Sequence, residues 1–206
     1  MRMNSIAAEY KVKRTVEKRE KSVNVKFYPE GGNLVAGLPS RVAFEATNAN
    51  GTPIGVEGKI ITAAGAEVAT FKTTHEGRGS FLYTPTAGDK AEVKYGSKTF
   101  SLDLPEVKGE GIVMNVDNIS SADSVFLSLH KSPNLDLPLV GAATVSAGKL
   151  CNFAMLDTTQ PIPIKYAIAK KDLSAGVSRV VITDPAGGVI ADRLIFNNLG
   201  EVATIN

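Results

Sequence analysis

Apolar and polar residues alternate with a period of two along much of this 206-residue chain. Near the start, Val23, Val25 and Phe27 alternate with Asn24 and Lys26. The same alternation returns further along, at 42–47, 91–95, 100–104 and 112–117. Successive side chains of a strand point to opposite faces, so this period buries one face and leaves the other in water. The pattern therefore predicts an all-β protein without long amphipathic helices.

Clusters of turn-forming residues separate the predicted strands. The run 48–53 contains the pair Asn50-Gly51, which accepts the positive φ angles of a tight hairpin. The runs 75–79 and 184–188 each contain a pair of glycines. Short strands with a turn about every eight to twelve residues are typical of β-sandwiches and barrels. We therefore expect immunoglobulin-like (Ig-like) sandwiches.

One stretch, 105–111, breaks the alternation with a proline, two glycines and mixed charges. It predicts a boundary between two tandem Ig-like domains, each close to the roughly 100-residue length of such a sandwich. We assign residues 1–22 to a charged linker or edge segment, 23–105 to the first domain and 111–206 to the second.

Composition narrows the classes of function. The net charge is only +2, and the basic residues concentrate in the run 11–21, where acids are mixed with them. This favours a solvated linker over a nucleic-acid surface. No stretch is long and apolar enough to span a membrane. The first residues lack the apolar core of a signal peptide, so we expect either a cytoplasmic protein or a piece of an exported chain.

Motifs of catalysis and metal binding are missing. The single cysteine, Cys151, excludes an intrachain disulfide and a cysteine-based metal site. His75 is followed by Glu76, but Gly79 stands where a zinc protease would have its second histidine. The glycine-rich run 141–149 has the wrong spacing for a phosphate loop. We therefore predict no enzyme activity, no cofactor and no metal, with calcium at a loop cluster left open.

Several runs together resemble a known family. The segment 27–44 carries Tyr28-Pro29-Glu30-Gly31-Gly32, the run 71–85 contains a Gly-x-Gly hairpin followed by Tyr-Thr-Pro, and 173–196 contains Asp-Arg-Leu-Ile-Phe in its last strand. These runs resemble macroglobulin-like β-sandwich domains of bacterial cell-envelope proteins, such as those found with the plug-like regions of TonB-dependent receptors. The resemblance covers about 24–196, and it extends the predicted fold to macroglobulin-like domains.

The resemblance implies a non-enzymatic module of the cell envelope. Such a module acts as a scaffold or a protein-interaction segment of a larger receptor-associated or macroglobulin-like protein, in the periplasm or at the cell surface. A cytoplasmic location stays open. Cys151 is followed by Asn152-Phe153 rather than Gly-Glu-Gln, so a thioester is not expected. The alternatives are a carbohydrate-binding module, which the absence of Trp disfavours, and an uncharacterised hydrolase.

Binding by such folds usually lies in the loops at the ends of the sandwich. The turn-rich, polar runs 48–53, 75–79 and 131–138 are therefore the candidate interaction loops, and the partner is another protein or a neighbouring domain, not a nucleic acid. The candidate residues are Asn50, His75, Glu76, Arg78, Asn134 and Asp136.

Other positions have predicted structural roles. Phe44 and Phe196 are assigned to the cores of the first and second domains because aromatic residues on alternating strands usually point inward. Gly31, Gly32, Gly77 and Gly79 are expected to supply positive φ angles, which a Cβ atom disfavours. Arg193 is expected to pair with an acidic residue or with backbone carbonyl groups.

Overall fold

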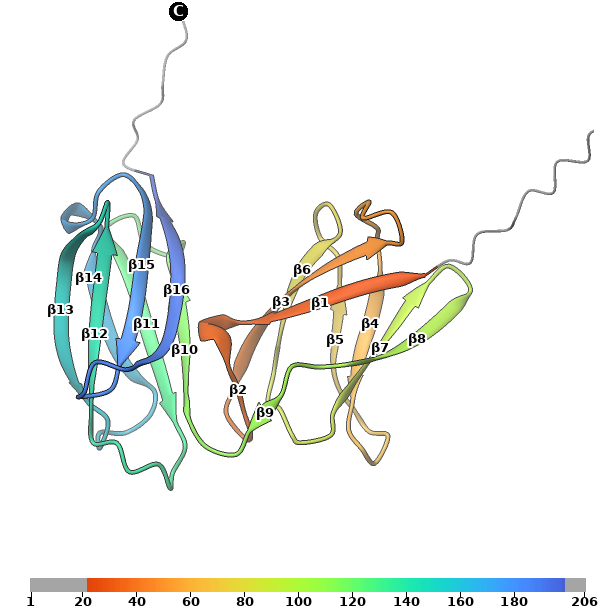
Figure 1. Ribbon diagram of the computed structural model, residues 1–206, viewed down its shortest axis with the longest axis horizontal. Coiled ribbons are helices and arrows are strands. Elements are labelled where there is room, and N and C mark those ends of the chain that lie inside the picture. Colours follow the sequence, from red (N-terminus) through yellow and green to blue (C-terminus); the bar gives the residue numbers. More distant parts are fainter. Residues whose placement is uncertain (1–21, 199–206) are drawn as a thin grey trace, which may run out of the picture.

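A computed structural model describes residues 22–198. The protein is all-β and consists of two tandem Ig-like β-sandwiches (Figure 1). In the first sandwich, a three-stranded sheet has the order β1-β3-β6 and a four-stranded sheet has the order β5-β4-β7-β8. These strands are β1 (Val23–Pro29), β3 (Ser40–Asn48), β4 (Glu57–Ile61), β5 (Glu67–Lys72), β6 (Arg78–Tyr83), β7 (Lys90–Tyr95) and β8 (Lys98–Asp103).

The second sandwich pairs a three-stranded sheet, β10-β11-β14, with a four-stranded sheet, β13-β12-β15-β16. Its strands are β10 (Ile112–Asp117), β11 (Ser124–Lys131), β12 (Leu139–Ser146), β13 (Lys149–Asp157), β14 (Ile164–Ala169), β15 (Gly176–Thr183) and β16 (Val189–Asn197). The remaining elements are β2 (Leu34–Val35), β9 (Val107–Lys108) and the short 3-10 helices η1 (Glu30–Gly32) and η2 (Lys170–Asp172). Within the described residues, no helix is long and apolar enough to cross a membrane.

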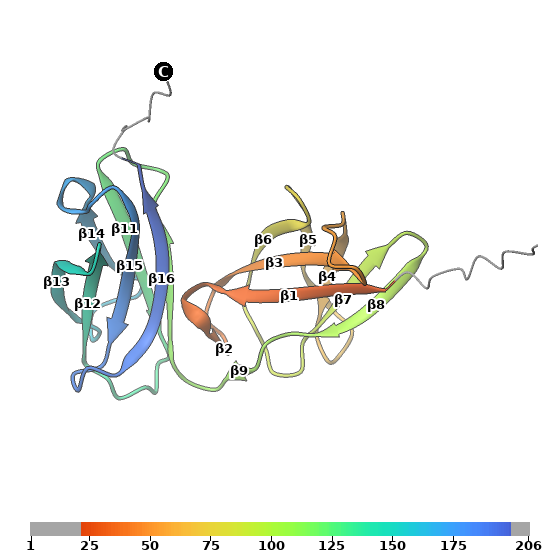
Figure 2. The same cartoon turned by 45° about the horizontal axis from the view of Figure 1, so that its top comes forward.

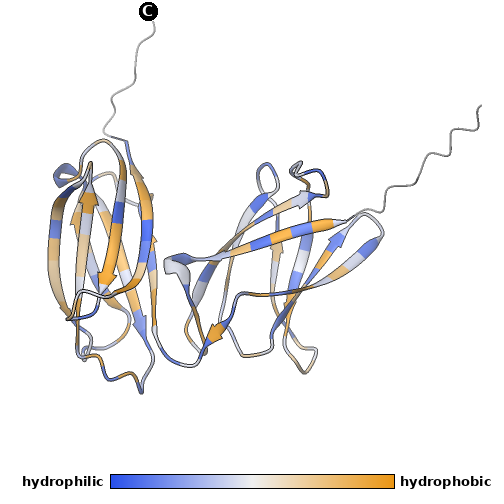
Figure 3. Cartoon of the chain, in the orientation of Figure 1, coloured by the Kyte–Doolittle hydropathy of each residue, from blue (hydrophilic) through white to orange (hydrophobic). Residues whose placement is uncertain are grey.

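Aromatic packing forms the core of the first sandwich. The alternation of β1 is visible as hydrophobic and hydrophilic bands in Figure 3, and it turns Phe27 toward the opposite sheet. Phe44 is only 2% exposed. Its ring centre lies 4.9 Å from that of Phe71, which stacks on Phe81 at 5.0 Å. Aromatic pairs at such distances stabilise a core beyond their area burial. The prediction that Phe44 is a core residue is confirmed.

The second core is aliphatic, and the prediction that Phe196 belongs to it is wrong. Phe196 is 63% exposed and points away from the core, while its neighbour Asn197 is buried. The Asn197 amide donates hydrogen bonds to the carbonyl oxygens of Lys170, Leu173 and Ser174 at 3.1–3.4 Å. These bonds satisfy carbonyl groups around η2, and Asn197 turns inward together with the buried core residues Ala191 and Ile195 of the same strand.

A corner of the first sandwich inserts into the second. Figures 1 and 2 both show β1 running to the junction, where η1 lies against β10 and β16, the neighbouring edge strands of the two opposing sheets. Gly31 has φ +78°, and a Cβ atom there would lie 3.3 Å from the Cβ atoms of both Ala191 and Met114. Glycine is therefore favoured by the backbone angle, and the close approach leaves little room for a Cβ atom.

The positive φ angles predicted for Gly31, Gly32 and Gly77 are confirmed. The prediction for Gly79 is wrong, because this glycine has no positive φ angle; a Cβ atom there would instead lie 2.5 Å from the Lys72 carbonyl oxygen.

The segment between the two sandwiches is tied to the first one. Residues of β9 pair in parallel with β2, and Val35, Leu38 and Val113 form a small buried cluster beside this pairing. The exact domain boundary at 105–111 stays a prediction. The segment assigned as a charged linker lies outside the described residues, apart from its last residue, Ser22.

Candidate functional site

The structure brings together two of the three predicted interaction loops. The turn 48–53 and the hairpin tip 75–79 lie side by side at one end of the first sandwich, because the Ala46 amide donates to the Gly77 carbonyl oxygen at 2.7 Å. A Cβ atom on Gly77 would lie 2.5 Å from that residue's carbonyl oxygen, Ala46 O, so only glycine permits this approach. Asn134 and Asp136 lie apart from these loops, on the connection between β11 and β12 of the second sandwich.

Local contacts hold the polar groups at this loop pair. Arg78 donates from Nε and Nη2 to Glu45 Oε1, at 3.1 and 3.0 Å. His75 Nε2 lies 3.7 Å from Glu76 Oε2, and the Asn50 amide donates to the side chain of Asn48 at 2.9 Å. These groups stabilise the turns and do not converge on a common point, so the six loop residues stay a prediction without a defined cavity.

A second surface is a stronger candidate for an interaction site than the loop pair. The outer face of the sheet β13-β12-β15-β16 exposes large apolar side chains, which we call the apolar sheet face: Leu150, Phe153, Met155, Val177, Leu194 and Phe196. The strand register places these residues on one side, because Phe153 pairs with Ala143, Ala143 with Val181, and Val177 with Phe196. Phe153 is 56% exposed, and its ring lies over Gly141.

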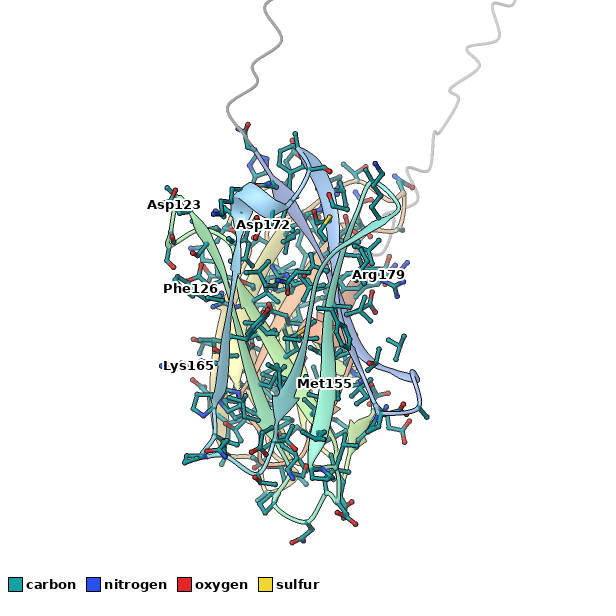
Figure 4. The ribbon with its side chains drawn as sticks, turned by 90° about the vertical axis from the view of Figure 1, so that its left-hand side faces the viewer. Asp123, Phe126, Met155, Lys165, Asp172 and Arg179 are labelled. Carbon is teal, nitrogen blue, oxygen red and sulfur yellow. The ribbon has the colours of Figure 1, made fainter. Side chains whose placement is uncertain are left out.

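One ion pair crosses the apolar sheet face. Arg179 Nε lies 2.7 Å from Asp192 Oδ2, between neighbouring strands β15 and β16. The hydrogen bond and the charge of Asp192 raise the pKa of the Arg179 guanidinium. Because these two charges neutralise each other, the ion pair adds no net charge to the apolar sheet face. Figure 4 shows Arg179 on the side of the second sandwich opposite to Phe126 and Lys165.

The equivalent four-stranded sheet of the first sandwich has the opposite character. Its outer face carries alternating charges around a depression of about 500 Å³. Lys72 Nζ lies 2.8 Å from Glu57 Oε1, and Lys59 Nζ lies 3.3 Å from Glu92 Oε2. The hydrogen bond from Lys72 lowers the pKa of Glu57. A face of this kind is well solvated, so of the two four-stranded sheets the one in the second sandwich carries the cluster of exposed apolar side chains.

The apolar sheet face continues into a groove at the junction of the sandwiches. This groove, of about 370 Å³, is lined by Leu194 and Phe196 together with Arg41 and Arg193. Both arginines pair with Glu30, a carboxylate on η1 whose side chain is 3% exposed. Glu30 Oε1 also accepts a hydrogen bond from the Val116 amide at 2.7 Å. Of the two kinds of partner predicted for Arg193, an acidic residue or backbone carbonyl groups, the structure shows an acidic residue, Glu30.

Among residues 22–198, no three or more histidine, cysteine, aspartate or glutamate side chains are grouped so that they could hold a metal ion. Cys151 is a free, partly buried thiol.

Sequence reasoning missed the apolar sheet face, although a signal was present. In the stretch 150–156, Phe153 and Met155 point outward while Ala154 and Leu156 point toward the core. Apolar residues on both faces of a strand are typical of a sheet that is covered on both sides. The strict alternation found elsewhere favoured a single buried face.

Comparison with protein families found no match, and comparison with well-described proteins found none either. Solved structures match the fold. A BSP domain of a biofilm-associated protein is 14% identical at a TM-score of 0.35, covering 86% of this chain and 30% of that chain. A two-domain fibronectin type III segment of chicken tenascin is 11% identical at 0.31, covering 85% and 98%. A purple acid phosphatase from yellow lupin seeds is 9% identical at 0.30, covering 83% and 41%. These likenesses concern the β-sandwich fold alone.

Proposed function

We propose that this chain is a non-enzymatic protein-interaction module that docks a neighbouring protein or domain through the apolar sheet face. The observation that carries the proposal is the exposure of large apolar side chains on one sheet of the second sandwich, next to a groove at the junction. Contiguous apolar patches on soluble domains commonly mark interaction surfaces.

The energetics favour a protein partner. Phe153, Leu194 and Phe196 are each more than half exposed. Covering the exposed part of each such side chain stabilises a complex by about 1 kcal/mol. The ion pair Arg179–Asp192 gives the face a polar centre, and such partly exposed pairs contribute more to orientation than to affinity.

The resemblance to macroglobulin-like domains supports a place in the bacterial cell envelope. We propose that the two sandwiches belong to a larger receptor-associated or macroglobulin-like protein in the periplasm or at the cell surface, where they act as a scaffold between neighbouring domains. The insertion of η1 between β10 and β16 supports this role, because it joins the two sandwiches through buried contacts.

The test compares two charged double variants in cells of the native host. Phe153→Lys with Phe196→Lys disrupts the apolar sheet face, whereas Thr70→Lys with Thr99→Lys changes the charged sheet of the first sandwich. Both pairs lie on exposed strand positions, and circular dichroism melting checks that both variants fold.

We expect proteins that copurify with the natural chain to remain with the threonine variant and to be lost from the phenylalanine variant. Retention of the same proteins by both variants would contradict the proposal.

A further inference from the structure

A separate hollow lies on the other side of the second sandwich. It has a volume of about 520 Å³ and occupies the outer face of the sheet β10-β11-β14. We call it the β10-β11-β14 hollow. Its lining includes Asn115, Asp117, Phe126, Ser128, Lys165 and Ala167.

The strand register explains why this face is concave. Phe126 on β11 pairs with Asp117 on one side and with Ala167 on the other. In the next outward row, Ser128 stands between Asn115 and Lys165. The small side chains of Ser128 and Ala167 leave space beside the larger ones, so the phenylalanine ring borders an open volume and is 42% exposed.

The polar groups around Phe126 differ in their hydrogen-bonding character. The Asp117 carboxylate accepts hydrogen bonds from the side chain and amide of Ser120 and from the Ile119 amide, and these lower its pKa to about 2. Asp117 is therefore ionised at neutral pH and can still accept further bonds. Lys165 supplies donors, and Ser128 supplies a hydroxyl group that both donates and accepts.

Asn115 adds an unsatisfied group. Its Oδ1 atom is buried and accepts no hydrogen bond from the described residues. The terminal torsion of asparagine is broad, so the amide can rotate at small cost. Leaving a buried acceptor without a hydrogen bond is energetically costly. A rotation that brings the Asn115 oxygen to a hydroxyl donor in the hollow would therefore remove this cost.

We propose that the β10-β11-β14 hollow binds one neutral sugar unit of a glycan. The C–H-rich face of a pyranose ring is slightly positive and packs on the negative face of the Phe126 ring. The sugar hydroxyls then meet Asp117, Ser128 and Lys165, each of which offers the donors or acceptors they require. One carboxylate and one ammonium group flank the hollow, so their charges balance and favour a neutral sugar over an acidic one.

This site is distinct from the apolar sheet face, because it lies on the opposite sheet of the sandwich; Asp117 alone of its named residues also lines the junction groove. Figure 4 shows Phe126 and Lys165 on the same side of the sandwich, away from Arg179. The volume is within the range of small-ligand sites, which is roughly 300–1,000 Å³.

The test is an NMR titration of the ¹⁵N-labelled chain with methyl glycosides of neutral hexoses, N-acetylhexosamines and deoxyhexoses, and with methyl glycosides of hexuronic acids as the acidic arm. We expect at least one neutral glycoside to bind with a millimolar dissociation constant and to shift amides of β10, β11 and β14. Absence of such shifts with every neutral glycoside, or binding of the acidic sugars alone, would overturn the proposal.

Two variants locate the site. Phe126→Ala removes the aromatic surface, and Ala167→Leu fills the hollow from an exposed position without entering the core. Each should weaken binding by about tenfold or more. Phe153→Ala, the matched exposed phenylalanine on the apolar sheet face, should leave it unchanged. Unaltered binding by both hollow variants, or an equal loss in Phe153→Ala, would contradict the assignment. Melting temperatures of all three variants check their folding.

Discussion

Replacing Glu30 by alanine tests whether the carboxylate on η1 holds the two sandwiches together. Its side chain is 3% exposed and pairs with Arg41 Nε at 3.4 Å and with Arg193. It also accepts the Val116 amide hydrogen bond at 2.7 Å. The substitution therefore removes a buried charge that contacts β3 of the first sandwich and both β10 and β16 of the second.

The magnitude follows from these contacts. A hydrogen bond to a charged group contributes about 1.5–3 kcal/mol, and an unsatisfied buried amide adds to the loss. Breaking a buried ion pair costs about 3–5 kcal/mol. The arginines are 51% and 37% exposed and regain water, which reduces the cost. We expect Glu30→Ala to lower the free energy of unfolding by about 3 kcal/mol.

The assay is urea unfolding followed by far-ultraviolet circular dichroism and tyrosine fluorescence, since the chain has no tryptophan. Glu45→Ala is the matched control. It also removes a carboxylate paired with an arginine, Arg78, but this pair is exposed at 63% and 32% and should contribute less than about 1 kcal/mol. Equal losses in the two variants, or a loss below about 1 kcal/mol for Glu30→Ala, would refute the reasoning.

Three further results follow from the structure. In urea unfolding, Phe44→Ala should lower the free energy of unfolding by about 3–5 kcal/mol, and Phe196→Ala by less than about 0.5 kcal/mol. Similar losses in the two variants would contradict the burial of Phe44 and the exposure of Phe196. The Asp117 carboxyl group should titrate with a pKa of about 2 in ¹³C NMR. Since this pKa is depressed in the folded protein, the stability that the ionised carboxylate contributes should be lost only as the pH falls toward that value. A titration midpoint at the usual value of 3.8 would be inconsistent with the hydrogen bonds that Asp117 accepts. Limited proteolysis should cut first within 105–111 or within about the first twenty residues. Early cuts within 42–95 would contradict the predicted boundary.

Alternation and turn residues were sufficient to locate most strands. The predicted alternating stretch 42–47 lies within β3, and the predicted turn 184–188 separates β15 from β16. Both depend on local chemistry, because a period of two and a positive φ angle are properties of short segments. The all-β fold was predicted for this reason.

Features that depend on distant residues were harder to predict. The side of β16 that faces inward carries Ala191, Ile195 and Asn197, whose amide bonds carbonyl groups around η2, so the choice of Phe196 as a core residue was wrong. The sequence indicated an acidic partner for Arg193 but not that the partner is Glu30, which lies far away in the chain. The full extent of the apolar sheet face likewise becomes apparent when β13, β12, β15 and β16 are placed in one sheet.

The most direct test of the proposed function is site-specific photo-crosslinking in the native host. A photoreactive phenylalanine analogue is placed at Phe153 on the apolar sheet face or, as the control, at the exposed position Thr99 on the charged sheet of the first sandwich. We predict discrete protein adducts from position 153 that are absent from position 99. No adduct at position 153, or the same adducts at both positions, would contradict the assignment of the apolar sheet face as the docking surface.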